Sequence, residues 1–229
     1  MVSKGIFIIG TDTDVGKTLV TASLGWKLSK RVNRLGVMKP FATGIKPYSK
    51  KYSSKDVAIL CKSIGLNEDE KNVNPYYFPI PCSPYMATDL LGLSQVDLNY
   101  ALEKYEYMNK NYDYLLIEGI GGLLVPLNNS SSLLDFIKMI NMEVIIVTTP
   151  KVGTVNHTML TVKLCLANGI SIRGIVVNKM PTRPTIIELN TPHFIEKLTN
   201  IQVIGTVPFI KSFKYSTHTF KMVSDVINF

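Results

Sequence analysis

Apolar positions along the chain alternate between short continuous runs and longer stretches with helical spacing. The continuous runs predict buried strands at Ile6–Ile9, Gly36–Lys39, Tyr114–Ile117, Val144–Thr148, Ile172–Asn178 and Val203–Val207. The spaced stretches predict helices at Lys17–Lys30, Asp56–Ile64, Ser94–Met108, Leu133–Ile140, Thr154–Ala167, Thr185–Leu198 and Thr219–Ile227. Repeated strand–helix–strand units indicate an α/β fold, a three-layer parallel sheet with helices on both faces.

The length and composition narrow the class of protein further. A chain of 229 residues without linker or repeat suits a single domain over residues 1–229. Hydrophobic residues make up 46% and charged residues 18%, which excludes a disordered chain. No apolar run nears the roughly 20 residues that span a bilayer, and Ile6–Ile9 is too short for a signal-peptide core. We therefore expect a cytoplasmic protein that does not enter a membrane.

Three further features of the sequence are less specific about structure and function. The formal charge of +8 fits a nucleic-acid ligand, a polyanionic small substrate or a lysine-rich surface, and we interpret the lysine-dense residues 46–55 as a solvated loop. The three cysteines have no disulfide or zinc spacing, and Cys61 and Cys165 fit small buried side chains. The proline-rich stretch Asn72–Thr88 lacks a period, which predicts a long irregular loop that is functional or mobile.

A phosphate-binding loop follows the first predicted strand directly, as Gly10-Thr-Asp-Thr-Asp-Val-Gly16-Lys17-Thr18. The generic pattern GxxxxGK[ST] is met only in its tail, because Thr11 stands where the first glycine is expected. Backbone N–H groups and a helix N-terminus would face the anion, Lys17 would reach the β- and γ-phosphates, and the Thr18 hydroxyl would meet Mg²⁺. A buried strand before and an amphipathic helix after the loop favour nucleotide binding over an ordinary glycine-rich turn.

Two acidic residues of this loop, Asp12 and Asp14, are unusual beside a triphosphate. They could face a cation such as a substrate amine. Asp12 could equally brace the loop by accepting backbone hydrogen bonds. The sequence leaves both interpretations open.

Three more charged residues lie at predicted element ends. Glu118 leaves the strand Tyr114–Ile117 beside several glycines, which indicates a metal ligand, since Mg²⁺ with a nucleotide takes one or two protein carboxylates. Asp56 could be a second ligand or could cap its helix. Lys39 ends the second strand and could stabilise charge in phosphoryl transfer, or could be an exposed surface lysine.

Together these stretches resemble the dethiobiotin synthetase family. The matching segments are Gly10–Thr18, Lys39–Gly44, Asp56, Ser83-Pro84, Glu118–Leu127, Gly153–Thr161 and Val177–Lys179, in family order. The resemblance implies a phosphate-loop NTPase fold and an ATP- and Mg²⁺-dependent ligase. In that family CO₂ carboxylates 7,8-diaminopelargonate to a carbamate, ATP phosphorylates the carbamate, and the second amine closes the ureido ring of dethiobiotin, a late step of biotin biosynthesis.

The resemblance also implies roles for individual residues. Lys17 and Lys39 would be catalytic, and Thr18, Asp56 and Glu118 would hold Mg²⁺. Thr13, Thr43, Gly153 and Asn156 would bind the diamine substrate, the last two at a helix start supplied by the partner subunit of a homodimer. The nucleotide would contact Asp14, Val15, Gly16, Lys17, Thr18, Leu19, Asp56, Glu118, Gly119, Ile120, Gly121, Asn178, Lys179, Pro208, Phe209 and Ile210. From their own positions in the sequence, His157 and His193 need no metal role and are expected to be structural.

Several positions depart from the family pattern, and two rival functions share parts of it. Asp14, Thr43, Lys179, Phe209 and Tyr215 stand where other residue types are frequent, which indicates altered adenine and ribose contacts. A corrin-type amidoligase would need a further glutaminase domain. A partitioning-type ATPase that switches on DNA or membrane would have a second lysine early in the loop, near Thr13. We therefore expect small-molecule partners and neither nucleic acid nor membrane.

Overall fold

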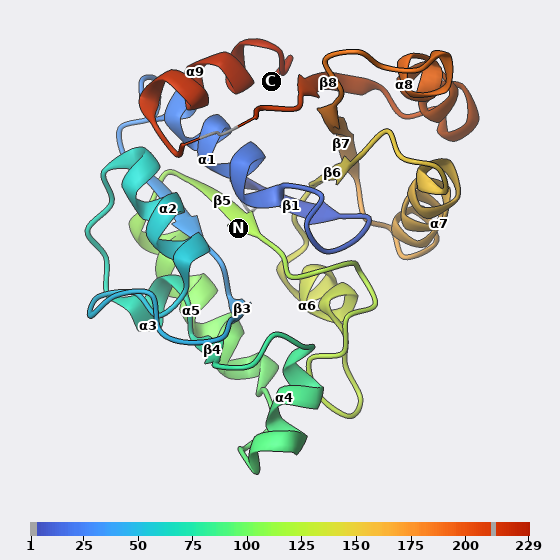
Figure 1. Cartoon of the computed structure of the whole chain (residues 1–229). Coiled ribbons are helices and arrows are strands. Elements are labelled where there is room, and N and C mark those ends of the chain that lie inside the picture. The colour runs from blue at the N-terminus through green and yellow to red at the C-terminus, as the bar shows by residue number, and fades with distance from the viewer. Residues whose placement is uncertain (1–3, 212–213) are drawn as a thin grey trace.

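The computed structural model describes residues 4–211 and 214–229, and its centre is a six-stranded sheet of parallel strands (Figure 1). The spatial order is β2-β5-β1-β6-β7-β8. The strands are β1 (Gly5–Gly10), β2 (Leu35–Met38), β5 (Tyr114–Glu118), β6 (Val144–Thr148), β7 (Ile172–Met180) and β8 (Val203–Pro208). This confirms the α/β fold with helices around a parallel sheet that the hydrophobic pattern predicts.

Helices cover both faces of this sheet (Figure 1). On one face α1 packs between α2 and α9, while α5, α6, α7 and α8 pack around the other. Their bounds are α1 (Lys17–Leu28), α2 (Lys55–Ile64), α5 (Leu98–Asn111), α6 (Leu133–Ile140), α7 (Thr154–Ala167), α8 (Ile186–Thr199) and α9 (Thr217–Asp225). Most bounds lie within a few residues of the predicted ones, and the largest shift is at α5, where the Asp97 side chain caps the helix through the Asn99 N–H.

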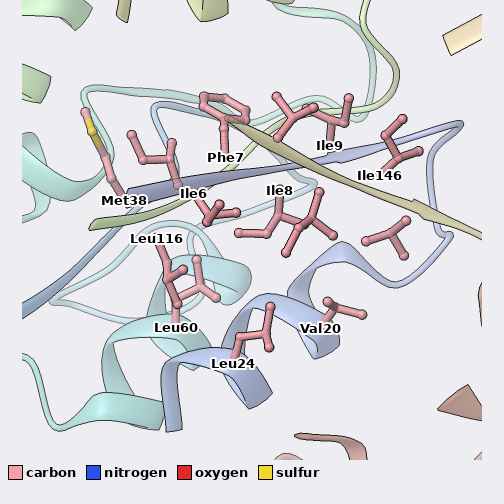
Figure 2. Close-up of a cluster of buried hydrophobic side chains, with 14 of the residues drawn as sticks. Ile6, Phe7, Ile8, Ile9, Val20, Leu24, Met38, Leu60, Leu116 and Ile146 are labelled. Atoms are coloured by element: carbon pink, nitrogen blue, oxygen red, sulfur yellow. The ribbon is translucent and has the colours of Figure 1, made fainter. Parts of the chain in front are cut away.

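The buried side chains of β1 show why a continuous apolar run specifies a central strand. Phe7 and Ile9 point to one face of the sheet and Ile8 to the other, towards α1 (Figure 2). All three have no measurable exposure, and the Phe7 ring packs edge-on against Phe136 of α6 at 6.5 Å. Because a strand's side chains alternate between faces, a strand covered on both sides must be apolar at every position.

One predicted segment folds differently from the expectation. Residues 72–88 are not a long irregular loop, because they hold the end of α3 (Glu70–Val73), the strand β4 (Tyr76–Phe78) and most of α4 (Pro84–Leu91). β4 pairs in parallel with β3 (Phe41–Thr43) to form a separate two-stranded sheet. These elements are too short to show a period in the sequence, and β4 is specified by its partner and not by its own pattern.

Two smaller predictions are confirmed. Cys61 and Cys165 are buried and free. α7 ends at Ala167, followed by Asn168 as C-cap and by Gly169 with a φ of +69°. In the described residues, no helix has both the length and the apolar character that crossing a membrane requires.

Candidate active site

The phosphate loop leaves β1 at Gly10 and enters α1 at Lys17. Gly16 precedes the helix with a φ of +98°, and a Cβ there would lie 2.0 Å from the Asn178 side-chain nitrogen. Only glycine therefore fits this position. No side chain caps α1, so the N–H groups of its first turn stay available for an anion.

Lys17 lies beneath this loop and is almost fully buried. Its Nζ donates to the backbone oxygens of Asp12 at 2.9 Å and of Gly121 at 3.0 Å. Burial lowers the pKa of Lys17 to about 8, and the positive charge of Lys39 adds to the effect. The ammonium is thus held among neutral carbonyls, where an added anion would be strongly attracted.

The register of the sheet brings Lys39 and Glu118 together. Met38 at the end of β2 pairs with Ile117 in β5. The residues that follow them, Lys39 and Glu118, therefore lie side by side at the carboxyl ends of these two strands. Lys39 Nζ lies 2.5 Å from Glu118 Oε1 and 2.8 Å from Asp56 Oδ2 of α2. Lys39 is only 6% exposed, so it is not the surface lysine that the sequence left as an alternative.

Glu118 is the most buried member of this cluster, at 1% exposure. Its Oε1 also accepts from the Thr18 hydroxyl at 2.8 Å. Burial raises the pKa of Glu118, and Lys39 and Thr18 hold part of that rise back. Burial also acts to lower the pKa of Lys39, but the Glu118 and Asp56 carboxylates outweigh it and raise the pKa above its usual value. Lys39 and Glu118 thus form a buried ion pair at this site.

The oxygen atoms of the cluster suit a hard divalent cation. Glu118 Oε2 is buried and has no hydrogen-bond partner among the described residues, and Asp56 and Thr18 add a carboxylate and a hydroxyl beside the same cavity. Among residues 4–211 and 214–229, no group of three or more His, Cys, Asp or Glu side chains gathers as a metal cage. This donor set fits Mg²⁺, which uses one or two carboxylates and takes its other ligands from phosphates and water.

A cavity of about 920 Å³ opens above these residues. Most of the predicted site residues line it, namely Thr13, Asp14, Gly16, Lys17, Thr18, Leu19, Lys39, Thr43, Asp56, Glu118, Ile120, Gly121, Asn178, Lys179, Pro208, Phe209 and Ile210. Val15 and Gly119 are buried and do not line it. Gly153 and Asn156 lie elsewhere, exposed at the start of α7, so one chain alone does not bring them to the cavity.

Hydrogen bonds decide two alternatives that the sequence left open. Asp12 accepts from the Thr13 N–H at 2.7 Å and does not line the cavity, so it braces the loop. Ser54 caps α2 by accepting from the Val57 N–H. Asp56 is therefore free of the capping role and bonds Lys39 instead.

The end of β7 clamps the phosphate loop, which the sequence did not predict. Asn178 Nδ2 donates to the Val15 carbonyl at 2.8 Å, and Lys179 Nζ donates to the Asp14 carbonyl. Lys179 has a φ of +62°, which turns the chain at this point. The cavity is also lined by Pro81, Cys82, Ser83, Val125 and Tyr215, which were not predicted as site residues. Ser83 and Val125 lie in segments that match the family, and Tyr215 stands at a departure from the family pattern, so the sequence gave a signal at these three positions.

These features define the class of protein. A phosphate loop ends in a glycine at the start of α1 and holds a buried lysine, and a carboxylate lies beside it at the carboxyl end of a parallel strand. This is the site of a P-loop nucleotide-binding protein. A family model described as an AAA domain matches residues 4–216. The fold is similar to a ParA family ATPase from Chlorobium tepidum (TM-score 0.55, 15% identity, 98% of this chain and 91% of that chain). It is equally similar to MinD of Aquifex aeolicus (TM-score 0.55, 14% identity, 97% and 93%).

Sequence comparison identifies the particular family. ATP-dependent dethiobiotin synthetase BioD of Nitrosopumilus maritimus is 40% identical over 208 residues, 91% of this chain and 90% of that protein. The enzymes of the same name from Caldicellulosiruptor saccharolyticus and Bacillus subtilis are 36% and 32% identical, over 92% and 98% of this chain and 87% and 95% of theirs. The chain belongs to the ATP-dependent dethiobiotin synthetase family. The ParA and MinD likeness shows the fold alone.

Proposed function

We propose that this chain is a dethiobiotin synthetase that uses Mg-ATP and CO₂ to close a ureido ring on 7,8-diaminopelargonate, in the cytoplasm. The observation that carries the proposal is the Lys39 ammonium between Glu118 and Asp56, beside the phosphate loop of a chain from this family. Such a lysine is positioned to stabilise negative charge that develops between a carbamate and a γ-phosphoryl group.

The reaction divides into three steps in which the chain's own residues hold charge. One substrate amine attacks CO₂ and loses a proton, which leaves a carbamate anion near Lys39. A carbamate oxygen then attacks the γ-phosphorus and ADP leaves, with Lys17 neutralising charge on the transferred group. The second amine attacks the carbamoyl carbon and loses a proton, phosphate leaves with the bonding electron pair, and the ureido ring closes.

Three residues would hold Mg²⁺, namely Thr18, Asp56 and Glu118. The ion would neutralise charge on the β- and γ-phosphates when bound. Lys39 donates to the Glu118 and Asp56 oxygens and lines the same cavity, where its ammonium would face the substrate. The unpartnered Glu118 Oε2 supports this assignment.

The cavity lining supports the substrate contacts that the family resemblance implies. Thr13 and Thr43 would contact the amine and carbamate end of the diamine, next to Lys39. The nucleotide would lie along the first turn of α1. Its base would enter between Asn178 and the segment Pro208–Ile210, and Lys179 would lie beside it.

The remaining part of the proposal is a homodimer in which Gly153 and Asn156 of one chain bind the substrate carboxylate of the other. The exposed start of α7 offers helix N–H groups to an anion. Val152 beside it is 94% exposed. Further exposed apolar side chains lie on the mutually packed helices α7 and α8, namely Leu160, Leu166, Ile186, Ile187, Leu189, Phe194 and Leu198. Exposed apolar surface of this extent supports a protein interface.

The proposal is tested by incubating the protein with 7,8-diaminopelargonate, Mg-ATP and ¹³C-bicarbonate, followed by mass spectrometry. Dethiobiotin carrying the ¹³C label should form, and phosphate release should require both the diamine and bicarbonate. Lys39→Ala is the control for contaminating activity. ATP hydrolysis that ignores the diamine and responds to DNA or lipid would instead favour the partitioning-type ATPase.

A further inference from the structure

Lys39 is held by a segment that does not touch the cavity. β2 ends at Met38, so Lys39 lies beyond the hydrogen-bonded ladder of the main sheet. Its backbone N–H donates to the Val73 carbonyl at 2.8 Å, and its carbonyl accepts from Asn74 Nδ2 at 2.7 Å. Both backbone groups of Lys39 thus depend on the last residue of α3 and on Asn74, the residue that follows it.

Asn74 is an unusual residue for its surroundings. It is 3% exposed, and its Nδ2 donates a second hydrogen bond to the Tyr76 carbonyl at 3.0 Å. Its Oδ1 is buried and finds no hydrogen-bond partner in the part of the chain that the structure describes. A buried unpaired amide oxygen costs stability, so packing alone does not account for asparagine here. What the side chain supplies is two donors, aimed at the carbonyls of Lys39 and Tyr76.

The hydrogen bonds to these carbonyls hold the backbone where the chain passes from Lys39 into β3. The residue after Lys39 is Pro40, which has no N–H and whose carbonyl accepts from the Tyr76 N–H at 3.1 Å. β3 then pairs with β4 from Phe41 opposite Tyr76 onwards. Asn74 therefore aligns the two segments at the point where the chain turns from Lys39 into β3. A displacement there moves the Lys39 side chain relative to Glu118.

We propose that Asn74 is a positioning residue for the reaction, which acts on Lys39 through the Lys39 carbonyl and touches neither substrate nor nucleotide. This inference rests on the proposed function, because it assigns Asn74 to the lysine that the reaction uses. Small displacements of a reacting group carry large costs in rate, so a residue outside the cavity can control turnover.

The chain offers a matched control two residues away. Asn72 is also buried, at 9% exposure, but its Nδ2 donates to Glu68 Oε1 at 3.1 Å and not to Lys39. Asn74→Ala should lower kcat on the order of tenfold to a hundredfold while KM for ATP stays near the wild-type value. Asn72→Ala should change thermal stability but leave kcat near wild type.

A double-mutant comparison separates positioning from general damage. In a Lys39→Ala background, Asn74→Ala should cause no further loss of kcat, since the lysine through which it acts is gone. Losses that multiply in the double variant would overturn the proposal, and so would equal losses of kcat in Asn74→Ala and Asn72→Ala.

Should Asn74→Ala fail to fold, Asn74→Asp replaces it. Its carboxyl can donate to the Lys39 carbonyl only when protonated, so kcat should recover relative to wild type as the pH falls. Wild-type kcat at every pH, or a loss that ignores pH, would refute the role.

One readout does not need the reaction at all. Trace acetylation of the unliganded protein, read by mass spectrometry, reports how accessible and how firmly paired each lysine amine is. Lys39 should acetylate several-fold faster in Asn74→Ala than in wild type, while Lys17 stays unchanged. If wild type makes no dethiobiotin but Lys39 labelling responds to Asn74, the proposed function fails and the positioning holds. If dethiobiotin forms and Lys39 acetylates at the same rate in wild type and in Asn74→Ala, only the positioning role fails.

Discussion

Replacing Lys17 with methionine should change how the stability of the unliganded protein depends on pH. Methionine keeps most of the buried length of the side chain and removes the ammonium. Burial lowers the pKa of Lys17 to about 8 in the folded protein, against 10.5 as the ordinary value. Between these two pH values the unfolded chain binds a proton at this site that the folded protein does not bind.

The sign and size of the effect follow from that difference. Where the unfolded state binds more protons, the free energy of unfolding rises with pH. Each pKa unit corresponds to about 1.4 kcal/mol, so from pH 7.5 to pH 9.5 wild type should gain about 2 kcal/mol relative to Lys17→Met. Comparing the two proteins cancels the titration of every other group that both share.

The assay is urea unfolding of both proteins at pH 7.5 and 9.5 without nucleotide. Lys62→Met, which removes an exposed lysine of α2, is the control for the loss of one positive charge. If the difference in free energy of unfolding between wild type and Lys17→Met stays constant with pH, Lys17 is not deprotonated in this range. That result would refute the argument that burial lowers its pKa. With wild type, phosphates should favour charged Lys17, so affinity for ATP should fall as pH rises above about 8.

Three further predictions concern the neighbouring residues. Lys39→Ala should lower kcat on the order of 10²–10³-fold in a steady-state assay and, by leaving the Glu118 carboxylate buried and unpaired, reduce stability by about 3–5 kcal/mol in urea unfolding; near-normal kcat would return Lys39 to a structural role. Glu118→Gln and Asp56→Asn should each raise the Mg²⁺ concentration that gives half-maximal turnover, with little loss of helix stability in Asp56→Asn because Ser54 caps α2; a loss of stability without a change in the Mg²⁺ titration would contradict the ligand role. Asn156→Asp should raise KM for the diamine and not for ATP, and mixing it with inactive Lys39→Ala should restore activity at hybrid sites after subunit exchange; no recovery after proven exchange would place each site within one chain.

The sequence by itself determined the layers of the fold and the location of the phosphate loop. Continuous apolar runs of strand length such as Ile6–Ile9 favour a strand that is buried on both faces, so the pattern indicates the structure locally. Gly16-Lys17-Thr18 is equally local, because a left-handed glycine, a helix start and a lysine within three residues form one unit. These parts could be predicted because each depends on neighbours in the chain.

The short elements of residues 72–88 could not be predicted in this way. β4 has three residues, and its hydrogen-bond partners come from β3, more than thirty positions earlier in the chain. Asn74 has no motif that would mark it, because its importance depends on which carbonyls come to lie beside it. The clamp from Asn178 to the Val15 carbonyl likewise spans the chain from β7 to the first loop.

Tertiary structure alone decided how the charged residues combine. The sequence left Lys39 between a catalytic and a surface role, and Asp56 between a ligand and a cap. The pairing of Met38 with Ile117 placed Lys39 beside Glu118, and the packing of α2 brought Asp56 to the same ammonium. The hydrophobic pattern specifies which faces of the strands and helices are buried. Strand order and register specify which side chains from distant parts of the sequence come into contact, and the electrostatics of this site depend on those contacts.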